Sequence, residues 1–303
     1  MITLINTSEK YKALKRLCNL SKKEIDIYFD SYKKIFNDQN MISTLEDYKN
    51  NRPVTGVIIP EMKKPSEYMS DCYSILKDLC ALGNVKKMYI PNCMDLNKSL
   101  IRNQELYEMY IAKKLNINKN STILELGCGC GRIAYYISNI TNSMVYGINI
   151  DNTQLDDARN YAKKKNYNKL KFIFADNNYK LPFKNNMFNA IYGIQAFIAF
   201  AVNIESSMNE FFRILKPGGR IILSDVILLD NFNRNNKHHL KLMKGTRNVL
   251  RGSNFVHYKY IEDIGKKIGF NLVMSKGGDP PNLAAELPML KSEHKNYENI
   301  QNI

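Results

Sequence analysis

Apolar and polar positions follow two different periods along the chain, and the change falls near residue 120. Before it, apolar residues recur every three or four positions, as they do on one face of an amphipathic helix. This period predicts helices at about 8–19, 21–38, 66–82 and 98–115. The sequence therefore predicts a helical N-terminal segment over residues 1–118.

After residue 120, short apolar runs alternate with segments of helical period. The runs predict strands at 121–126, 144–149, 170–175, 189–194, 219–227 and 270–275, with a further strand near 283–290. The segments between them predict helices at 131–140, 152–165, 204–215 and 259–268. Such alternation indicates βαβ units, in which helices cover a parallel sheet. We therefore expect an α/β domain over 119–291, followed by a polar tail over 292–303.

Composition narrows the class of protein. The chain has no run of about 18 apolar residues, so no transmembrane helix is expected. Its first residues carry Lys10, Lys12 and Lys15 and lack the features of a signal peptide. The six cysteines form no CxxC pair and no metal-like spacing with histidine. We expect reduced thiols, no metal site and a cytoplasmic location.

The chain is basic, with a formal net charge of +15. That charge favours contact with polyanions such as nucleic acid or anionic lipid. The lysines are scattered, however, and no basic stripe interleaved with aromatic residues is present. Nucleic acid is therefore not expected as a partner, whereas peripheral contact with a membrane stays open. The sequence leaves the oligomeric state open as well.

A glycine turn follows the first predicted strand of the α/β region. The apolar run Ile123–Leu126 is followed by Gly127, Gly129 and Gly131, and then by a helical segment. Strand, glycine turn and helix bring backbone N–H groups and a helix N-terminus close to a ligand. Glycine permits that approach because it has no Cβ and adopts positive φ. A dinucleotide fingerprint needs a glycine at the sixth position, where this chain has Arg132.

The pattern Glu-x-Gly-x-Gly-x-Gly at 125–131 resembles the first motif of class I S-adenosylmethionine-dependent methyltransferases. Later segments are similar to that family in the same order: Asp176-Asn177, Leu181-Pro182-Phe183, and Arg-x-Leu-Lys-Pro-Gly-Gly at 213–219. The resemblance implies a Rossmann-like, mostly parallel, seven-stranded sheet. It also implies S-adenosyl-L-methionine as the cofactor.

In this kind of sheet the ligand lies at the carboxyl ends of the strands. Asp176 can accept from the adenine amine, and Asn177 N–H can donate to the adenine ring; an Asx turn is the alternative role of Asp176. Asn149 stands where most of the family has an acid. Asp151 is either a substitute for that acid or the N-cap of the next helix. The predicted cofactor-binding residues are Glu125, Gly127, Gly129, Asn149, Ile150, Gln154, Asp176, Asn177 and Gln195.

Two stretches indicate which class of molecule accepts the methyl group. Enzymes that methylate base amines carry Asn/Asp-Pro-Pro-Tyr after the fourth strand, where this chain has Ile194-Gln195-Ala196-Phe197. The stretch 147–159 and the Ile194–Ala196 turn are similar to sterol 24-C-methyltransferases, and this resemblance covers about 66–275. It implies C-methylation of a small hydrophobic molecule, a sterol or isoprenoid-like lipid. The aromatic sterol-binding segment of that family is replaced here by Leu79–Val85, and the chain has no tryptophan.

Two other functions stay open from the sequence. One is O- or N-methylation of another small metabolite, for which His238 or His239 could act as a general base. The other is a non-catalytic cofactor-binding or nucleic-acid-associated protein. For C-methylation, aromatic side chains before the sheet such as Tyr73 and Tyr89 could stabilise a carbocation. No catalytic residue is assigned.

Overall fold

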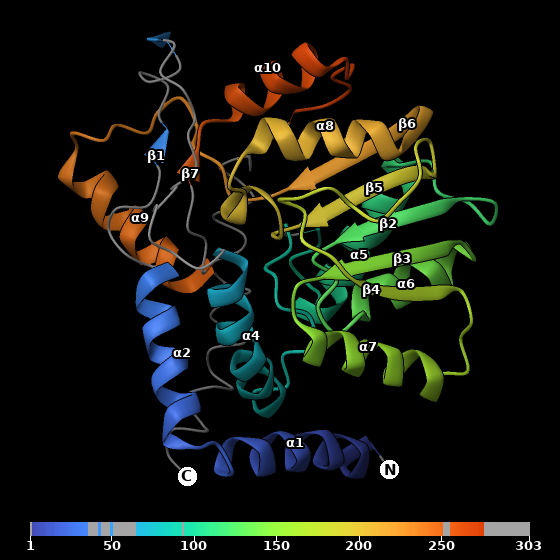
Figure 1. The fold of residues 1–303 in the computed structure, drawn as a ribbon, viewed down its shortest axis with the longest axis vertical. Helices are drawn as coiled ribbons and strands as arrows, with labels where there is room; N and C mark the ends of the chain where they lie inside the picture. Colours follow the sequence, from blue (N-terminus) through green and yellow to red (C-terminus); the bar gives the residue numbers. More distant parts are fainter. Residues whose placement is uncertain are drawn as a thin grey trace.

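A computed structural model describes residues 2–35, 42–43, 49–50, 65–92, 94–250 and 255–275. A parallel sheet of five strands lies at its centre, in the order β4-β3-β2-β5-β6 (Figure 1). The strands are β2 (Thr122–Leu126), β3 (Met144–Asn149), β4 (Leu170–Phe174), β5 (Phe188–Ile194) and β6 (Leu215–Ser224). The strand order reverses between β2 and β5, and ligands bind at such a switch point in parallel sheets.

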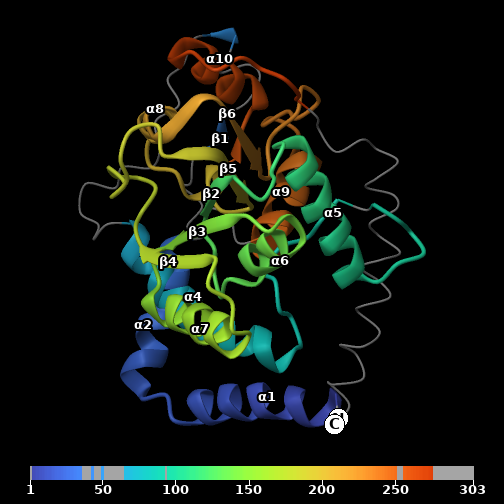
Figure 2. The ribbon, with the colours of Figure 1, turned by 90° about the vertical axis from the view of Figure 1, so that its right-hand side faces the viewer.

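Helices cover both faces of the sheet because its central strands are apolar on both faces. In β2, Ile123 belongs to one buried cluster and Leu124 to another, and neither is exposed. The first cluster is completed by α5 (Leu100–Lys114), α6 (Arg132–Thr141) and α7 (Asn152–Lys164). The second is completed by α8 (Ile204–Ile214) and α10 (Tyr258–Ile268). Figure 2 shows α5 beside α6, on the side of the sheet away from α8.

The ends of these elements follow from local sequence. Asp151 is the N-cap of α7: its Oδ1 accepts from Thr153 N at 2.8 Å, and its Oδ2 accepts from Gln154 Nε2 at 3.1 Å. The helix-cap interpretation of Asp151 is therefore confirmed. The Lys-Pro-Gly-Gly segment at 216–219 lies inside β6, where the register shifts between Leu215, paired with Phe188, and Arg220, paired with Ala190.

The remaining helices lie beside the sheet. Helices α1 (Ile2–Cys18) and α2 (Lys22–Ile35) pack on α4 (Pro65–Leu82), as Figure 1 shows. Lys77 of α4 pairs with Asp157 of α7 at 2.9 Å, which ties this group of helices to the sheet. Helix α9 (Lys237–Leu250), the short helix η1 (Ile198–Phe200), and the paired strands β1 (Ile42–Ser43) and β7 (Phe255–Val256) complete the described elements. No described helix is long and apolar enough to cross a bilayer.

The expectation of seven strands is wrong for the part of the chain that the structure describes: the main sheet has five, all parallel. Residues 270–275, expected as a strand, follow the helix-ending Gly269 and are irregular. They pair with no described strand, and Leu272 and Val273 are 52% and 80% exposed. A β-strand needs a hydrogen-bonding neighbour, which an apolar pattern alone does not supply. The strand expected near 283–290 and the tail 292–303 lie outside the described residues.

Gly131, which precedes α6, gives a test of packing at the end of the glycine turn. Its φ is 70°, and a Cβ there would lie 2.6 Å from the Phe172 ring and 2.9 Å from Ala158 Cβ. Gly218 has a similar φ of 74° but open space around it. Gly218→Ala should therefore lower the free energy of unfolding only by the left-handed strain, roughly 1–2 kcal/mol. Gly131→Ala should lower it by about 1–3 kcal/mol more, because its Cβ also clashes with its neighbours. Urea unfolding measures both, and equal losses would contradict the close packing.

Asp225, directly after β6, fixes the chain that follows β5. Its Oδ2 accepts from Phe197 N at 3.2 Å and from Ile198 N at 3.1 Å. Burial raises the pKa of this carboxyl to about 7, although the backbone donors oppose the shift. The folded protein therefore holds a proton that the unfolded chain releases near pH 4. Stability should be lost as the pH rises from about 4 to 7.

Asp225→Asn keeps an acceptor for the two N–H groups and has no charge to desolvate. Relative to the unchanged protein, it should gain about 1–2 kcal/mol of stability between pH 5.5 and pH 8. Urea unfolding at both pH values measures that gain. A difference between the two proteins that stays constant with pH would show that Asp225 ionises normally.

Candidate functional site

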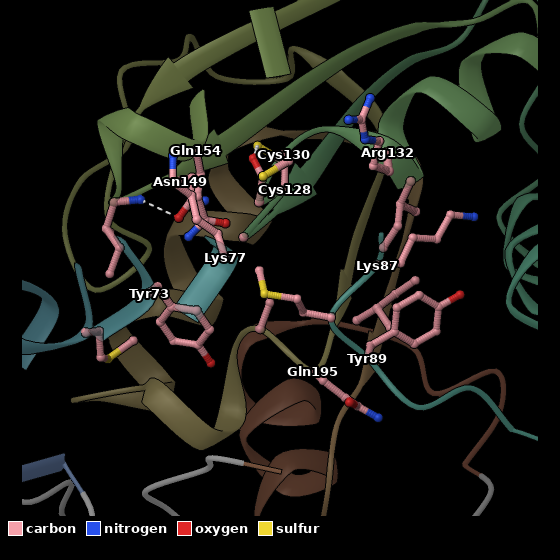
Figure 3. Close-up of a pocket in the computed structure, with 18 of the residues that line it drawn as sticks. Tyr73, Lys77, Lys87, Tyr89, Cys128, Cys130, Arg132, Asn149, Gln154 and Gln195 are labelled. Carbon is pink, nitrogen blue, oxygen red and sulfur yellow. Dashed lines mark hydrogen bonds between the residues drawn. The ribbon is translucent and has the colours of Figure 1, made fainter. Parts of the chain in front are cut away.

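A cleft lies over the carboxyl ends of β2, β3 and β5, at the switch point of the sheet (Figure 3). The glycine turn and the residues after the strands line one side of it. Helix α4 lines the other side, together with residues 85–89 of a segment that we call the strap, residues 85–91. The cleft holds about 1110 Å³ of empty space, its open mouth included.

The three glycines of the turn have different neighbours, although all have φ between 52° and 70°. A Cβ on Gly127 would lie 2.6 Å from Ala196 Cβ, and a Cβ on Gly131 would enter the Phe172 ring. Gly129 faces the cleft instead, where a Cβ would meet Gln154 Oε1 at 3.2 Å. Gly127 and Gly131 therefore allow the backbone to pack, whereas Gly129 allows a ligand to approach the backbone.

Gln154 brings an unpaired acceptor to the same place. Its side chain is 2% exposed, and its Nε2 donates to Asp151. Its Oε1 is buried and has no hydrogen-bond partner in the part of the chain that the structure describes. A buried, unpaired carbonyl oxygen costs about 1–3 kcal/mol. This oxygen therefore marks a position where a ligand can donate a hydrogen bond.

Polar side chains lie at the end of β3 and just after the end of β4. Asn149 Oδ1 accepts from Ile150 N at 2.8 Å. Asp176 Oδ1 accepts from Asn178 N at 2.9 Å and Asn178 Nδ2 at 3.0 Å, so a turn role of Asp176 is observed. Asn177 Nδ2 makes a longer contact of 3.4 Å with Ala196 O. These residues all line the cleft.

Glu125 differs from the other predicted residues because it does not line the cleft. It is 2% exposed, and its Oε2 has no hydrogen-bond partner among the described residues. Burial raises the pKa of its carboxyl well above the usual range, and the neighbouring Tyr192 hydroxyl of β5 opposes that shift. Eight of the nine predicted cofactor-binding residues therefore line the cleft, and their role in binding stays a prediction.

The strap is attached to α5 by buried polar contacts. Lys87 Nζ donates to both oxygens of Glu108, at 2.8 and 2.6 Å, and Tyr89 OH donates to Oε1 at 2.7 Å. Gln104 Nε2 donates to Tyr89 O at 2.9 Å. Glu108 is fully buried, and burial raises its pKa while Lys87 and Tyr89 oppose the shift. These contacts hold the strap in place over the cleft.

On its other side the strap meets Gln195, directly after β5. Gln195 Nε2 donates to Ile90 O at 2.9 Å, and Gln195 Oε1 accepts from Ile90 N at 3.2 Å. Gln195 is in the left-handed region, with φ 50°. Its amide is therefore bonded to backbone at both ends, although the residue lines the cleft as predicted.

The N-terminal helices contribute residues that the sequence did not assign to cofactor binding. Tyr73 of α4 meets Phe200 edge-on, with ring centres 6.2 Å apart, and both line the cleft. Helical periodicity placed Tyr73 on a helix but could not show which face meets the distant sheet. The cleft is further lined by Met69, Lys77, Cys80, Val85, Lys86, Met88, Arg132 and Asn178.

Other candidate groups are excluded or lie elsewhere. Burial raises the pKa of the Cys130 thiol to about 12, so it stays protonated and is no nucleophile at neutral pH. His238 and His239 do not line the cleft. Among the described residues, no group of three or more His, Cys, Asp or Glu side chains could hold a metal ion.

Comparison with known sequences agrees with this geometry. Residues 117–275 match the family described as "Methyltransferase domain". The sterol 24-C-methyltransferase of Pneumocystis carinii is 36% identical over 128 residues, which are 42% of this chain and 33% of that protein. That of Saccharomyces cerevisiae is 28% identical over 189 residues, 61% of this chain and 48% of that protein. The chain thus spans a third to a half of the length of these relatives.

Solved structures share the fold. The [4+2]-cyclase SpnF has a TM-score of 0.63 at 16% identity, over 77% of this chain and 82% of that one. The cyclopropane synthase MmaA2 of Mycobacterium tuberculosis has a TM-score of 0.59 at 16% identity, over 70% and 76%. At these identities the likeness shows the fold alone. The family match covers more than half of the 303 residues and includes the glycine turn and the strand ends of the cleft. The chain therefore belongs to the methyltransferase domain family, with the class I fold.

Proposed function

We propose that this protein transfers a methyl group from S-adenosyl-L-methionine to a small hydrophobic molecule, a sterol or isoprenoid-like lipid, at carbon. The observation that supports cofactor binding is the unpaired Gln154 Oε1 beside Gly129, at the switch point of the sheet. The ammonium group of the cofactor would supply the donor that this oxygen lacks. Gly129 leaves room for the methionine end to lie against the backbone.

The other predicted residues fit the rest of the cofactor. Asn149 and Ile150, at the end of β3, would hold the ribose. The free carboxylate oxygen of Asp176 would accept from the adenine amine, and Asn177 N–H would donate to the ring. Gly127 and Glu125 would support the turn from behind. The bound cofactor supplies an electrophilic methyl group on sulfur, and the chain has to bind it, orient it and exclude water.

The cleft opposite the glycine turn supports a hydrophobic acceptor. Met69, Tyr73, Met88 and Phe200 face it from the helical segment, the strap and the turn after β5. Tyr73 and Phe200 present aromatic rings, which attract cationic charge such as that formed when an alkene is methylated. The sterol 24-C-methyltransferases that the chain is similar to are named for this kind of acceptor. Residues 1–118 would then act as the lid of the cleft.

Delivery of a lipid acceptor would require contact with a membrane surface. The exposed Tyr11 and Leu14 of α1 lie near Lys10 and Lys15 on the helix surface. Basic residues each add about 1 kcal/mol of attraction near anionic headgroups. Faster turnover of an acceptor held in anionic vesicles than in neutral ones would support this route. Equal rates in the two kinds of vesicle would argue against it.

The acceptor class is tested with the full chain and S-adenosyl-L-methionine labelled at the methyl group. Separate reactions contain a sterol with a side-chain double bond, an isoprenoid alkene, a set of small phenols and amines, and RNA. We expect label on carbon in the sterol or isoprenoid, and inhibition by S-adenosylhomocysteine. Label only on oxygen or nitrogen would favour the metabolite alternative, label only on RNA would overturn the lipid acceptor, and cofactor binding without any transfer would indicate a non-catalytic protein.

The role of Asp176 is tested by two substitutions. Asp176→Asn keeps the Oδ1 acceptor of the turn but replaces the second oxygen with a donor, which opposes the adenine amine. Its affinity for S-adenosyl-L-methionine should fall by about 1–3 kcal/mol, with little change in the unfolding midpoint. Asp176→Ala should lower both quantities. Calorimetric titration and thermal unfolding separate them, and unchanged affinity in Asp176→Asn would leave Asp176 as a turn residue only.

A further inference from the structure

The strap and the turn after β5 come from distant parts of the chain and meet beside the cleft. The strap contributes Met88 to the lining, and the turn contributes Ala196. Within the described residues, the hydrogen bonds that join the two are those between the Gln195 side chain and the backbone of Ile90. The amide donates to one backbone group and accepts from the other, as a neighbouring β-strand would.

Each partner of this contact is fixed from behind. The strap is attached to α5 through Glu108, whose carboxylate receives Lys87 and Tyr89. The turn is attached to the end of β6 through Asp225, which accepts from two backbone N–H groups. Gln195 therefore joins two segments that are each supported from behind.

The backbone of Gln195 supports a specific role. Its φ of 50° places a non-glycine residue in the left-handed region. That conformation costs about 1–2 kcal/mol and persists only where the surroundings fix it. Here Gln195 N donates to Ser224 O at 2.7 Å, and the side chain makes the pair of bonds to Ile90. Figure 3 shows Gln195 on the strap side of the cleft, near Tyr89 and away from Gln154 and Asn149.

We propose that Gln195 is a positioning residue: its side chain joins the strap to the turn after β5, so that the cover of the cofactor and the wall of the acceptor site close as one unit. This inference rests on the proposed function for its effect on turnover. We call the two bonds to Ile90 the Gln195 latch. Without it, each segment can move alone, so cofactor escapes faster and the reacting groups are aligned less often.

Gln195→Gly is the decisive variant. It removes the latch and also removes the left-handed strain, because glycine adopts positive φ freely. Its unfolding midpoint should therefore change little, because the relief of strain offsets the loss of the two bonds. Exchange of the Ile90 amide hydrogen should nevertheless become about tenfold faster, as expected for the loss of one hydrogen bond. Release of S-adenosylhomocysteine, measured by chase, should also become faster.

Gln195→Glu gives a second comparison at nearly constant size. A carboxylate still accepts from Ile90 N–H but has no donor for Ile90 O. The rates of Ile90 amide exchange and of S-adenosylhomocysteine release in this variant should therefore lie between those of the unchanged protein and those of Gln195→Gly. In turnover assays of both variants, kcat should fall by a larger factor than the factor by which the KM for the acceptor changes. Hydrogen exchange of the free protein needs neither cofactor nor acceptor, so it tests the latch even if the proposed function fails. Unchanged Ile90 exchange and ligand release in Gln195→Gly would overturn the inference.

Discussion

Burial of the central strands on both faces is the constraint on which the rest of the structure depends. Ile123 and Leu124 are adjacent in β2, point to opposite faces, and are both fully buried. Helices must therefore pack on both sides, and the chain can cross between parallel strands only over those faces. The carboxyl ends of the strands then meet at one edge. The glycine turn, Asn149, Asp176 and Gln195 all line the cleft at that edge for this reason.

That edge supplies half of a site, and the other half comes from far away in the sequence. Helix α4 and the strap lie over the cleft because ionic and polar contacts attach them to α7 and α5. Lys77, which lines the cleft, is paired with Asp157, and Lys87 with Glu108. The charges of these two lysines are therefore matched within the protein.

The sequence predicted those parts of the fold that depend on local order. The four helices predicted after residue 120 begin and end within a few residues of the predicted positions. Asp151 caps α7, which was one of the two roles predicted for it. The strand expected at 270–275 did not form because a strand depends on a partner, which lies elsewhere in the chain. Helix α9 was not expected, because its lysines and histidines conceal its apolar positions.

The candidate site shows the same division between local and distant information. Residues in motifs at strand ends were found, because a parallel sheet brings those ends together. The pair of hydrogen bonds between Gln195 and Ile90 was not predicted, because the two residues are far apart in the sequence and no local pattern indicates their contact. Tyr73 was placed among candidate aromatic residues, but only its contact with Phe200 shows that it faces the cleft.

The burial of Glu108 has a consequence for how the protein responds to salt. The Lys87–Glu108 pair is almost fully shielded from solvent, whereas Arg16, which pairs with Asp78, is 47% exposed. Dissolved ions screen exposed charges over about 10 Å at 0.1 M but act much less on buried pairs. Rising ionic strength should therefore loosen α1 from α4 while the strap stays on α5, which amide exchange of the two segments at low and high salt would show. The outer helices and the cover of the cleft are thus separable by ionic strength, although they belong to one continuous stretch of chain.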